Sequence, residues 1–169
     1  MNYFELFGVS QTFDVNLEDL SKKFKEMQMT FHPDKFTNKS KVEMEISEMY
    51  SRLLNQAYTT LKEPLKRGFY LLELKELPNE NNFLIAQDFL TSVLEKNEEL
   101  DDINTELNLE RFMKTNDVEI KKHINLVSES FYCNNWKEAR INLLKLNYFI
   151  NLEQKIKRKA TDFLSENKR

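Results

Sequence analysis

Residues that interrupt helices are scarce in this chain, and this scarcity limits the folds that it can adopt. Its 169 residues include 2 Gly and 3 Pro, whereas strands joined by tight hairpins need many such residues. Apolar residues recur instead at spacings of three and four, the period of an amphipathic helix. The 13 Phe provide enough apolar bulk for a core. The sequence therefore predicts a folded, all-α protein.

The first 75 residues contain four segments with helical periodicity. Gly8 ends the first segment, because glycine readily adopts the left-handed conformation of a helix exit. Asn16 is the expected N-cap of the second segment, and Pro33 ends that segment, since the residue before a proline is pushed into an extended conformation. Pro64 suits the first turn of the fourth segment. The expected helices are residues 3–7, 17–31, 41–62 and 65–75.

A second domain is expected after residues 76–83, which carry turn-forming residues and little apolar periodicity. The N-terminal domain, residues 1–75, is expected to be a helical hairpin with flanking short helices. A three-helix bundle is expected over residues 84–169. Asn134-Asn135 is a short connection, so the helices that it joins are predicted to be antiparallel neighbours. The expected bundle helices are residues 84–103, 106–133 and 135–166.

The charge and the cysteine content exclude several classes of function. The net charge is -3, and no Lys/Arg run with interleaved aromatic residues is present, so nucleic acid is not an expected partner. Cys133 is the only cysteine, so no disulfide can form within the chain, and a reducing compartment is expected. No segment approaches the length of apolar sequence that crosses a membrane. We therefore expect a soluble, cytoplasmic protein.

Glu119 and His123 lie one helical turn apart, a spacing that can in principle hold a metal ion. We reject a metal site, because the residues between His123 and Cys133 span about 15 Å along one helix. Cys133 is expected instead to be a small buried apolar residue. No set of nucleophile, base and orienting group and no glycine-rich phosphate loop can be drawn. We therefore expect no enzyme activity, no cofactor and no metal.

His32, Pro33 and Asp34, followed by Lys35 and Phe36, lie between two amphipathic segments and belong to neither. Pro33 fixes one backbone angle, which reduces the entropy that is lost on binding. The Asp34 carboxylate can pair with an arginine of a partner. The tripeptide is therefore expected to make a contact with another protein. The alternative is a turn that only ends a helix, with Asp34 as a cap for the next helical segment.

Residues on either side of this tripeptide have two expected roles. Lysines on the polar side of the second helix are expected to steer an acidic partner surface, unless they form only a solvated helix face: Lys22, Lys23 and Lys25, with Lys35 beside the tripeptide. One apolar stripe follows the third helix: Val42, Ile46, Met49, Leu53, Ala57 and Leu61. The core that joins the two helices is expected to contain Phe24, Phe31, Leu53, Leu54, Ala57 and Tyr58.

Short motifs follow one another along the chain in a characteristic order. They are Tyr3-Phe4-x-Leu6-Phe7-Gly8, Phe31-His32-Pro33-Asp34-Lys35-Phe36, Asn55-Gln56-Ala57-Tyr58, Leu61-x-x-Pro64-Leu65-x-Arg67 and Tyr70-Leu71-Leu72. Together they resemble the HscB-type family of DnaJ-like J-domain co-chaperones in iron-sulfur cluster assembly. The resemblance is close over residues 1–75 and looser after residue 84. The Cys-x-x-Cys extension of animal mitochondrial relatives is absent, which favours a bacterial-type protein.

The resemblance implies two protein partners. The tripeptide loop would dock on the ATPase domain of a DnaK-type (HscA-like) chaperone and trigger ATP hydrolysis. The residues implied in this contact are His32, Pro33, Asp34, Lys35, Lys22, Lys23 and Lys25. The bundle would bind an IscU-like iron-sulfur scaffold protein and deliver it to the chaperone. The residues implied in scaffold binding are Leu90, Leu94, Glu95, Glu98, Asp102 and Tyr148.

The charge distribution agrees with such a scaffold-binding face. Residues 76–103 contain eight acidic residues against Lys96 alone, whereas the 13 basic residues after position 103 exceed 9 acidic ones. The alternative is that the leucines belong to the core and the acidic face is only solvated. Two other functions stay open. One is a general J-domain adaptor whose acidic bundle binds a different protein or self-associates, and the weaker one is a catalytic helical bundle.

Overall fold

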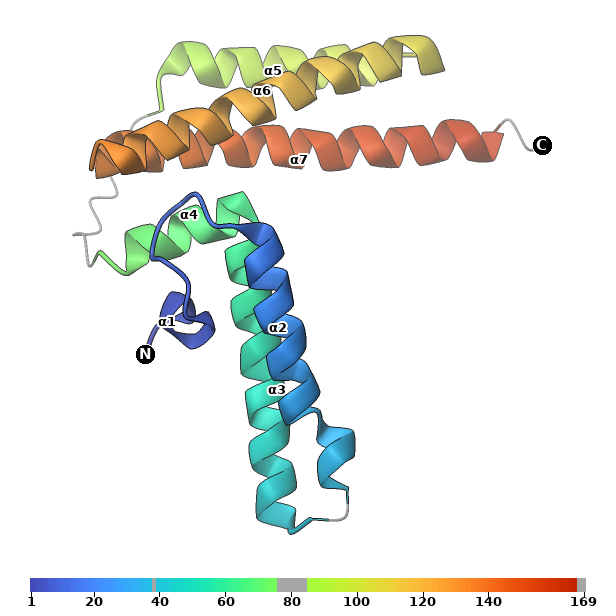
Figure 1. The fold of residues 1–169 in the computed structure, drawn as a ribbon. Coiled ribbons are helices and arrows are strands. Elements are labelled where there is room, and N and C mark those ends of the chain that lie inside the picture. Colours follow the sequence, from blue (N-terminus) through green and yellow to red (C-terminus); the bar gives the residue numbers. More distant parts are fainter. Residues whose placement is uncertain (38, 76–84, 167–169) are drawn as a thin grey trace. The chain divides into compact units, whose positions relative to one another are not determined.

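The computed structural model describes residues 1–37, 39–75 and 85–166 of the chain (Figure 1). All regular structure in these ranges is helical, which confirms the predicted all-α fold. The chain divides into two compact units, Met1–Glu76 and Leu77–Arg169, and the predicted linker, residues 76–83, lies outside the described residues. The helices of the first unit are α1 (Tyr3–Phe7), α2 (Leu17–Phe31), the 3-10 helix η1 (Pro33–Phe36), α3 (Lys41–Lys62) and α4 (Pro64–Glu73). The helices of the second unit are α5 (Gln87–Asp102), α6 (Glu106–Tyr132) and α7 (Trp136–Glu166).

Side-chain caps set the helix boundaries of the first unit. Asn2 caps α1 and Ser40 caps α3, each in a capping box with the glutamate three residues further on. The hydrogen bonds from Ser40 lower the pKa of the Glu43 carboxyl below its ordinary value. Asn16 caps α2, as predicted, by accepting hydrogen bonds from two backbone N–H groups of its first turn. Gly8 ends α1 with a φ of 57°, the left-handed conformation expected there.

The hairpin of α2 and α3 forms the body of the first unit (Figure 1). The buried apolar side chains of the unit are Phe4, Phe7, Phe13, Leu20, Leu54, Ala57, Leu61, Leu71 and Leu72. Two residues of the predicted hairpin core, Leu54 and Ala57, are fully buried, and the others are partly buried: Phe24, Phe31, Leu53 and Tyr58. The rings of Phe24 and Tyr58 stack with their centroids 4.1 Å apart. Each large side chain buried in this core contributes about 1.5 to 3 kcal/mol.

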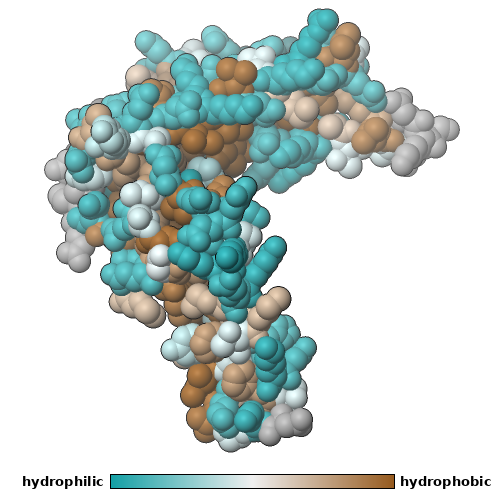
Figure 2. All heavy atoms as spheres, viewed as in Figure 1, coloured by the Kyte–Doolittle hydropathy of each residue, from teal (hydrophilic) through white to brown (hydrophobic). Residues whose placement is uncertain are grey.

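The apolar stripe of α3 is covered over only part of its length. Val42, Ile46 and Met49 lie on this stripe, yet they are 63%, 46% and 54% exposed. The Phe31 carbonyl oxygen at the end of α2 accepts a hydrogen bond from the Ser47 hydroxyl at 2.8 Å. The turns of α3 before Ser47, which carry Val42 and Ile46, therefore extend beyond the end of α2, which cannot cover them. Figure 2 shows hydrophobic atoms at the surface along one edge of this part of the hairpin.

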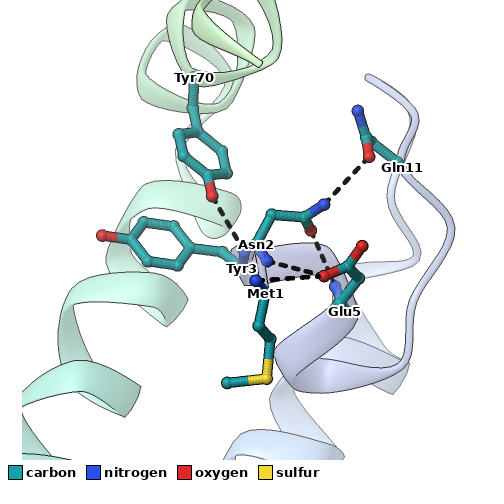
Figure 3. A network of polar contacts seen from close by, with 6 residues as sticks. All are labelled: Met1, Asn2, Tyr3, Glu5, Gln11 and Tyr70. Carbon is teal, nitrogen blue, oxygen red and sulfur yellow. Dashed lines mark hydrogen bonds and ion pairs between the residues drawn. The ribbon is translucent and has the colours of Figure 1, made fainter.

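Two residues of the sequence motifs connect α4 to the rest of the first unit. The buried Arg67 guanidinium donates to the carbonyl oxygens of Leu61 and Lys62, at 2.6 and 3.5 Å, and so pairs two carbonyl groups at the end of α3. The Tyr70 hydroxyl accepts a hydrogen bond from the backbone N–H of Tyr3 at 3.0 Å, and the two rings stack. Figure 3 shows this contact beside the cap of α1. These motif residues therefore stabilise the fold.

In the second unit, α6 and α7 form a long antiparallel pair with α5 alongside (Figure 1). The chain turns between them at Asn134 and Asn135, the predicted connection, where Asn134 has a φ of 54°. Leu100 of α5 joins a buried cluster from α6 and α7: Leu109, Phe112, Leu152 and Ile156. Among the described helices, none combines the length and the apolar character of a membrane span, and this includes the 31-residue α7.

Cys133 is exposed, so the prediction that it is a buried apolar residue is wrong. It is the C-cap of α6, and its backbone N–H donates to the Glu129 carbonyl oxygen at 2.9 Å. The chain leaves the helix pair at this point to turn toward α7, and connections of this kind run over the protein surface. The turn at Asn134 and Asn135 was predicted, but the expectation for Cys133 rested on its apolar character and not on its place beside that turn.

His123 is buried in the second unit. Its ring stacks on Phe149 of α7 at 5.2 Å and meets the edge of Phe89 of α5 at 6.4 Å. Its Nδ1 is buried without a hydrogen-bond partner, while its Nε2 lies 3.9 Å from the Glu119 carboxylate. Burial lowers the pKa of His123 below its ordinary value. The described part of the chain contains no group of three His, Cys, Asp or Glu side chains that could hold a metal ion.

Candidate functional site

The first candidate surface is the His32-Pro33-Asp34 loop between α2 and α3. His32 has the extended backbone that a following proline requires, with φ of -66° and ψ of 129°. Its Nδ1 accepts a hydrogen bond from the Asp34 backbone N–H at 3.3 Å and lies 3.5 Å from an Asp34 carboxylate oxygen. The side chains of His32 and Asp34 are 52% and 86% exposed. The imidazole therefore holds the backbone of Asp34, whose carboxylate is open to a partner.

The loop is attached to α3 on both of its sides. On the α2 side, the Phe31 carbonyl oxygen is held by Ser47, and the Phe31 ring stacks on Tyr50 at 5.1 Å. On the α3 side, the Thr37 hydroxyl donates to the Asp34 carbonyl oxygen at 3.2 Å, and η1 packs against α3. These contacts restrain the backbone of the loop before a partner binds, which lowers the entropy cost of binding.

The four lysines predicted to contact the chaperone differ in their surroundings. Lys22, Lys25 and Lys35 are exposed. Lys23 donates to the Gly8 carbonyl oxygen at 2.9 Å and pairs with the Asp19 carboxylate at 2.9 Å. Two of the three N–H groups of the Lys23 ammonium are thus engaged within the chain. The sequence could not reveal this contact, because Gly8 and Lys23 are brought together only by the packing of α1 on α2.

The second candidate surface lies on α5 and α7. Leu90 is partly buried, Leu94 is 65% exposed, and the three predicted acidic residues are exposed: Glu95, Glu98 and Asp102. Spacings of four residues place both leucines, Glu98 and Asp102 along one side of α5. Tyr148 of α7 is 36% exposed, and its ring packs edge-on against Phe89 of α5 at 5.7 Å. The fold therefore brings the predicted tyrosine next to the first turn of α5.

The prediction missed the residues that hold α5 in place. The Lys155 ammonium donates to the Asn97 side chain at 2.5 Å. The Lys159 ammonium donates to the carbonyl oxygens of Leu100 and Asp101, at 2.5 and 2.8 Å. A cation of α7 thus provides hydrogen bonds to carbonyl groups at the C-terminal end of α5. The opposite net charges of the two segments favour a contact between them, although both lysines bond here to amide or carbonyl oxygens and not to a carboxylate. They could not show which lysines make it.

Comparisons with known proteins agree with this architecture. Residues 85–157 match the family model described as the HSCB C-terminal oligomerisation domain. The chain is 34% identical to the iron-sulfur cluster co-chaperone protein HscB of Mus musculus, over 95% of this chain and 69% of the mouse protein. It is 31% identical to the co-chaperone protein HscB of Proteus mirabilis, over 92% and 94% of the two chains. The crystal structure of human co-chaperone protein HscB superposes with a TM-score of 0.88, at 34% identity over 95% of this chain and 82% of the human one.

The fold and these matches define a co-chaperone of iron-sulfur cluster assembly. The chain belongs to the HscB family. Its relatives include mammalian and bacterial proteins at similar identity, so the assignment to a bacterial form stays a prediction.

Proposed function

We propose that this chain stimulates the ATPase of a DnaK-type (HscA-like) chaperone and delivers an IscU-like iron-sulfur scaffold protein to it in the cytoplasm. Membership in a co-chaperone family supports this role. Delivery needs one surface for the chaperone and another for the delivered protein, and the chain has two candidate surfaces. The chaperone cleaves ATP, so the chain itself needs no catalytic group.

The observation that carries the chaperone contact is the exposed carboxylate of Asp34 on a loop that is already held. The Ser47 and Tyr50 contacts to Phe31 fix the loop, and the His32 imidazole accepts a hydrogen bond from the Asp34 backbone N–H. Arginine and carboxylate groups form strong, geometrically specific pairs when the carboxylate is positioned in advance. The exposed lysines add attraction to an acidic partner surface: Lys22, Lys25 and Lys35, with the part of Lys23 that stays free. Pro33 supplies the backbone restraint.

The scaffold contact is supported by an exposed apolar residue among carboxylates. Leu94 is 65% exposed on a helix that also presents Glu95 and Glu98. Leu90 lies one turn before Leu94 on the same side of α5, and Tyr148 of α7 packs against the neighbouring Phe89. Apolar anchors surrounded by polar groups are the usual arrangement of a protein-binding surface. The carboxylates of this face favour a scaffold that presents basic groups.

The first experiment replaces His32 with Gln and measures the ATPase rate of the HscA-like chaperone with increasing amounts of the full chain. We expect His32→Gln to lower the stimulation at least about tenfold, the effect of losing one dominant contact. The far-UV circular dichroism and the urea midpoint should stay as in the wild type, because His32 is exposed. Stimulation at the wild-type rate would contradict the proposal.

The second experiment titrates the scaffold protein against the full chain and measures the dissociation constant. The triple variant Leu90→Ala, Leu94→Ala, Tyr148→Ala should bind at least about tenfold more weakly, because it removes the apolar anchors. The matched control is Leu107→Ala, Val118→Ala, Tyr132→Ala, which removes three exposed side chains of similar size from α6 and should bind like the wild type.

Unchanged affinity in the first triple variant would remove the proposed scaffold surface. No binding by the wild type would favour the general J-domain adaptor, whose bundle binds another protein or a second copy. Sedimentation of the chain at the concentrations of the titration distinguishes these two cases.

A further inference from the structure

A pocket of about 390 Å³ lies between α5 and α7 in the second unit. This volume falls within the range of about 300 to 1,000 Å³ that is common for binding pockets. Val93 and Lys96 line the pocket from α5, and Tyr148, Leu152 and Lys155 line it from α7. Because Tyr148 also belongs to the proposed scaffold surface, the pocket is continuous with that surface.

The charge of the pocket differs from that of the surface beside it. Lys96 is the only basic residue among residues 76–103, and it lines the pocket. Neither Lys96 nor Lys155 forms an ion pair with another described residue, whereas Lys157 pairs with Glu153 on the same helix. No carboxylate is among the residues that line the pocket. The pocket therefore presents positive charge next to the acidic side of α5.

The Lys155 ammonium is held in position before any partner binds. It donates to the side-chain carbonyl oxygen of Asn97 at 2.5 Å. The amide nitrogen of Asn97 in turn donates to the Val93 carbonyl oxygen at 2.6 Å, which fixes the orientation of the Asn97 side chain. Two N–H groups of the ammonium remain for a further acceptor. A cation positioned in this way loses little entropy when it binds an anion.

The rest of the pocket is apolar. Leu152 is buried, Val93 is partly buried, and Tyr148 is 36% exposed. The Tyr148 ring is held edge-on against Phe89 at 5.7 Å. The pocket therefore suits a partner segment that carries both an apolar side chain and a carboxylate.

We propose that this pocket binds an acidic segment of the scaffold protein, that a carboxylate of the segment pairs with Lys155 and Lys96, and that a neighbouring apolar side chain packs against Val93 and Tyr148. The inference rests on the proposed function, which assigns Tyr148 to the scaffold contact. Lys96 and Lys155 are the residues that it adds to the site.

Two neighbouring areas of opposite charge determine the orientation of a partner. The exposed carboxylates of α5 attract basic groups of the scaffold, and the pocket attracts an acidic group. A scaffold that docked the other way round would place like charges against each other in both areas, which costs binding energy. The pocket therefore contributes specificity as well as affinity to the scaffold contact.

The test is Lys155→Glu in the full chain, with the dissociation constant of the scaffold protein measured at low and at moderate salt. We expect the dissociation constant to rise at least about tenfold at low salt, because like charges then face each other across the interface. The rise should become smaller with added salt. Lys155→Arg, which keeps the charge, should behave like the wild type. Lys96→Glu should also weaken binding, and it leaves the hydrogen bond between Lys155 and Asn97 in place.

Lys137→Glu is the matched control. Lys137 is an exposed residue of α7 about 27 Å from Lys155 along the helix, and its substitution changes the charge by the same amount. It should stay within about twofold of the wild type. The urea midpoint of each variant, followed by Trp136 fluorescence, should stay as in the wild type, so that weaker binding reports on the contact and not on the fold.

The outcomes separate this inference from the proposed function. If Lys155→Glu and Lys96→Glu both stay within about twofold while the Leu90, Leu94, Tyr148 triple variant binds weakly, the pocket proposal is overturned and the proposed scaffold surface stands. If the triple variant also binds like the wild type, the proposed surface itself fails. Tighter binding by Lys155→Glu would show that basic groups of the scaffold face the pocket, which overturns the proposal. A loss of chaperone stimulation in Lys155→Glu without the scaffold protein would overturn the choice of partner.

Discussion

Each unit of this protein buries one ionisable side chain in its described residues, and the two are used differently. Arg67 of the first unit and His123 of the second are 5% and 6% exposed. Each keeps one buried nitrogen without a hydrogen-bond partner, Nε of Arg67 and Nδ1 of His123, but Arg67 also donates to two carbonyl oxygens at the end of α3. Burial lowers the pKa of both groups, yet a guanidinium stays charged at any physiological pH. The first unit therefore depends on a fixed charge, and the second on a group that changes its charge in weak acid.

The larger effect on the free energy of unfolding is expected for a substitution at Arg67. Arg67→Met keeps much of the side-chain volume but leaves the Leu61 carbonyl group unpaired, so it should lower the free energy of unfolding of the first unit by about 2 to 3 kcal/mol. Trp136, the only tryptophan, lies in α7 and reports on the second unit alone. The variant should lower the urea midpoint measured by circular dichroism and leave the midpoint measured by Trp136 fluorescence unchanged.

Arg52→Met is the control for this comparison, since Arg52 is exposed on the same hairpin. It should change the free energy of unfolding by less than about 0.5 kcal/mol. Equal shifts of both midpoints in Arg67→Met would show that the two units unfold as one, and the contrast between them would then not hold.

The smaller expected effect is the pH dependence of the second unit. Because the pKa of His123 is lower in the folded state than in the unfolded state, the unfolded chain binds more protons. Stability is therefore fully present above the unfolded value of about 6.5 and is lost as the pH falls from there through the lower folded pKa. The charges that face this imidazole are Glu119, which opposes the shift, and Lys122 and Lys145, which add to it.

Urea unfolding followed by Trp136 fluorescence at about pH 7.5 and about pH 5.5 tests the direction in which stability changes with pH. The wild type should be less stable at the lower pH, and His123→Gln should lose most of this difference. His32→Gln serves as the control and should keep it, since His32 is an exposed residue of the other unit. A pH dependence that survives in His123→Gln would assign the effect to other groups.

Local signals in the sequence were enough to predict the helices and the loop. Gly8, Asn16 and Pro33 act on their own backbone or on the next turn, so their effects do not depend on distant residues. The His32-Pro33-Asp34 loop was found for the same reason. The exposure of the two surfaces could not be predicted in this way, because it depends on where one helix stops covering another.

Three particular residues show this limit. Ile46 continues an apolar stripe, but α2 ends before it can cover that turn, so the side chain is 46% exposed. Cys133 follows the helical period, but it lies where the chain turns at the surface. Lys23 lies on the polar side of α2, where a lysine is usually solvated, yet its ammonium group donates to the carbonyl oxygen of Gly8, fifteen residues earlier. Each outcome depends on packing between separate elements. The spacing of residues along one helix carries no information about such packing.

The uncovered stripe of α3 also has a consequence for the behaviour of the protein in concentrated solution. Val42 and Ile46 alternate along the chain with Glu43, Glu45 and Glu48, so two copies that brought their stripes together would also bring carboxylates of the same sign together. Charged residues placed beside an apolar segment in this way act as gatekeepers against aggregation. Salt screens their repulsion. The same few turns of α3 therefore combine apolar side chains that are open to solvent with charges that oppose the association of two copies.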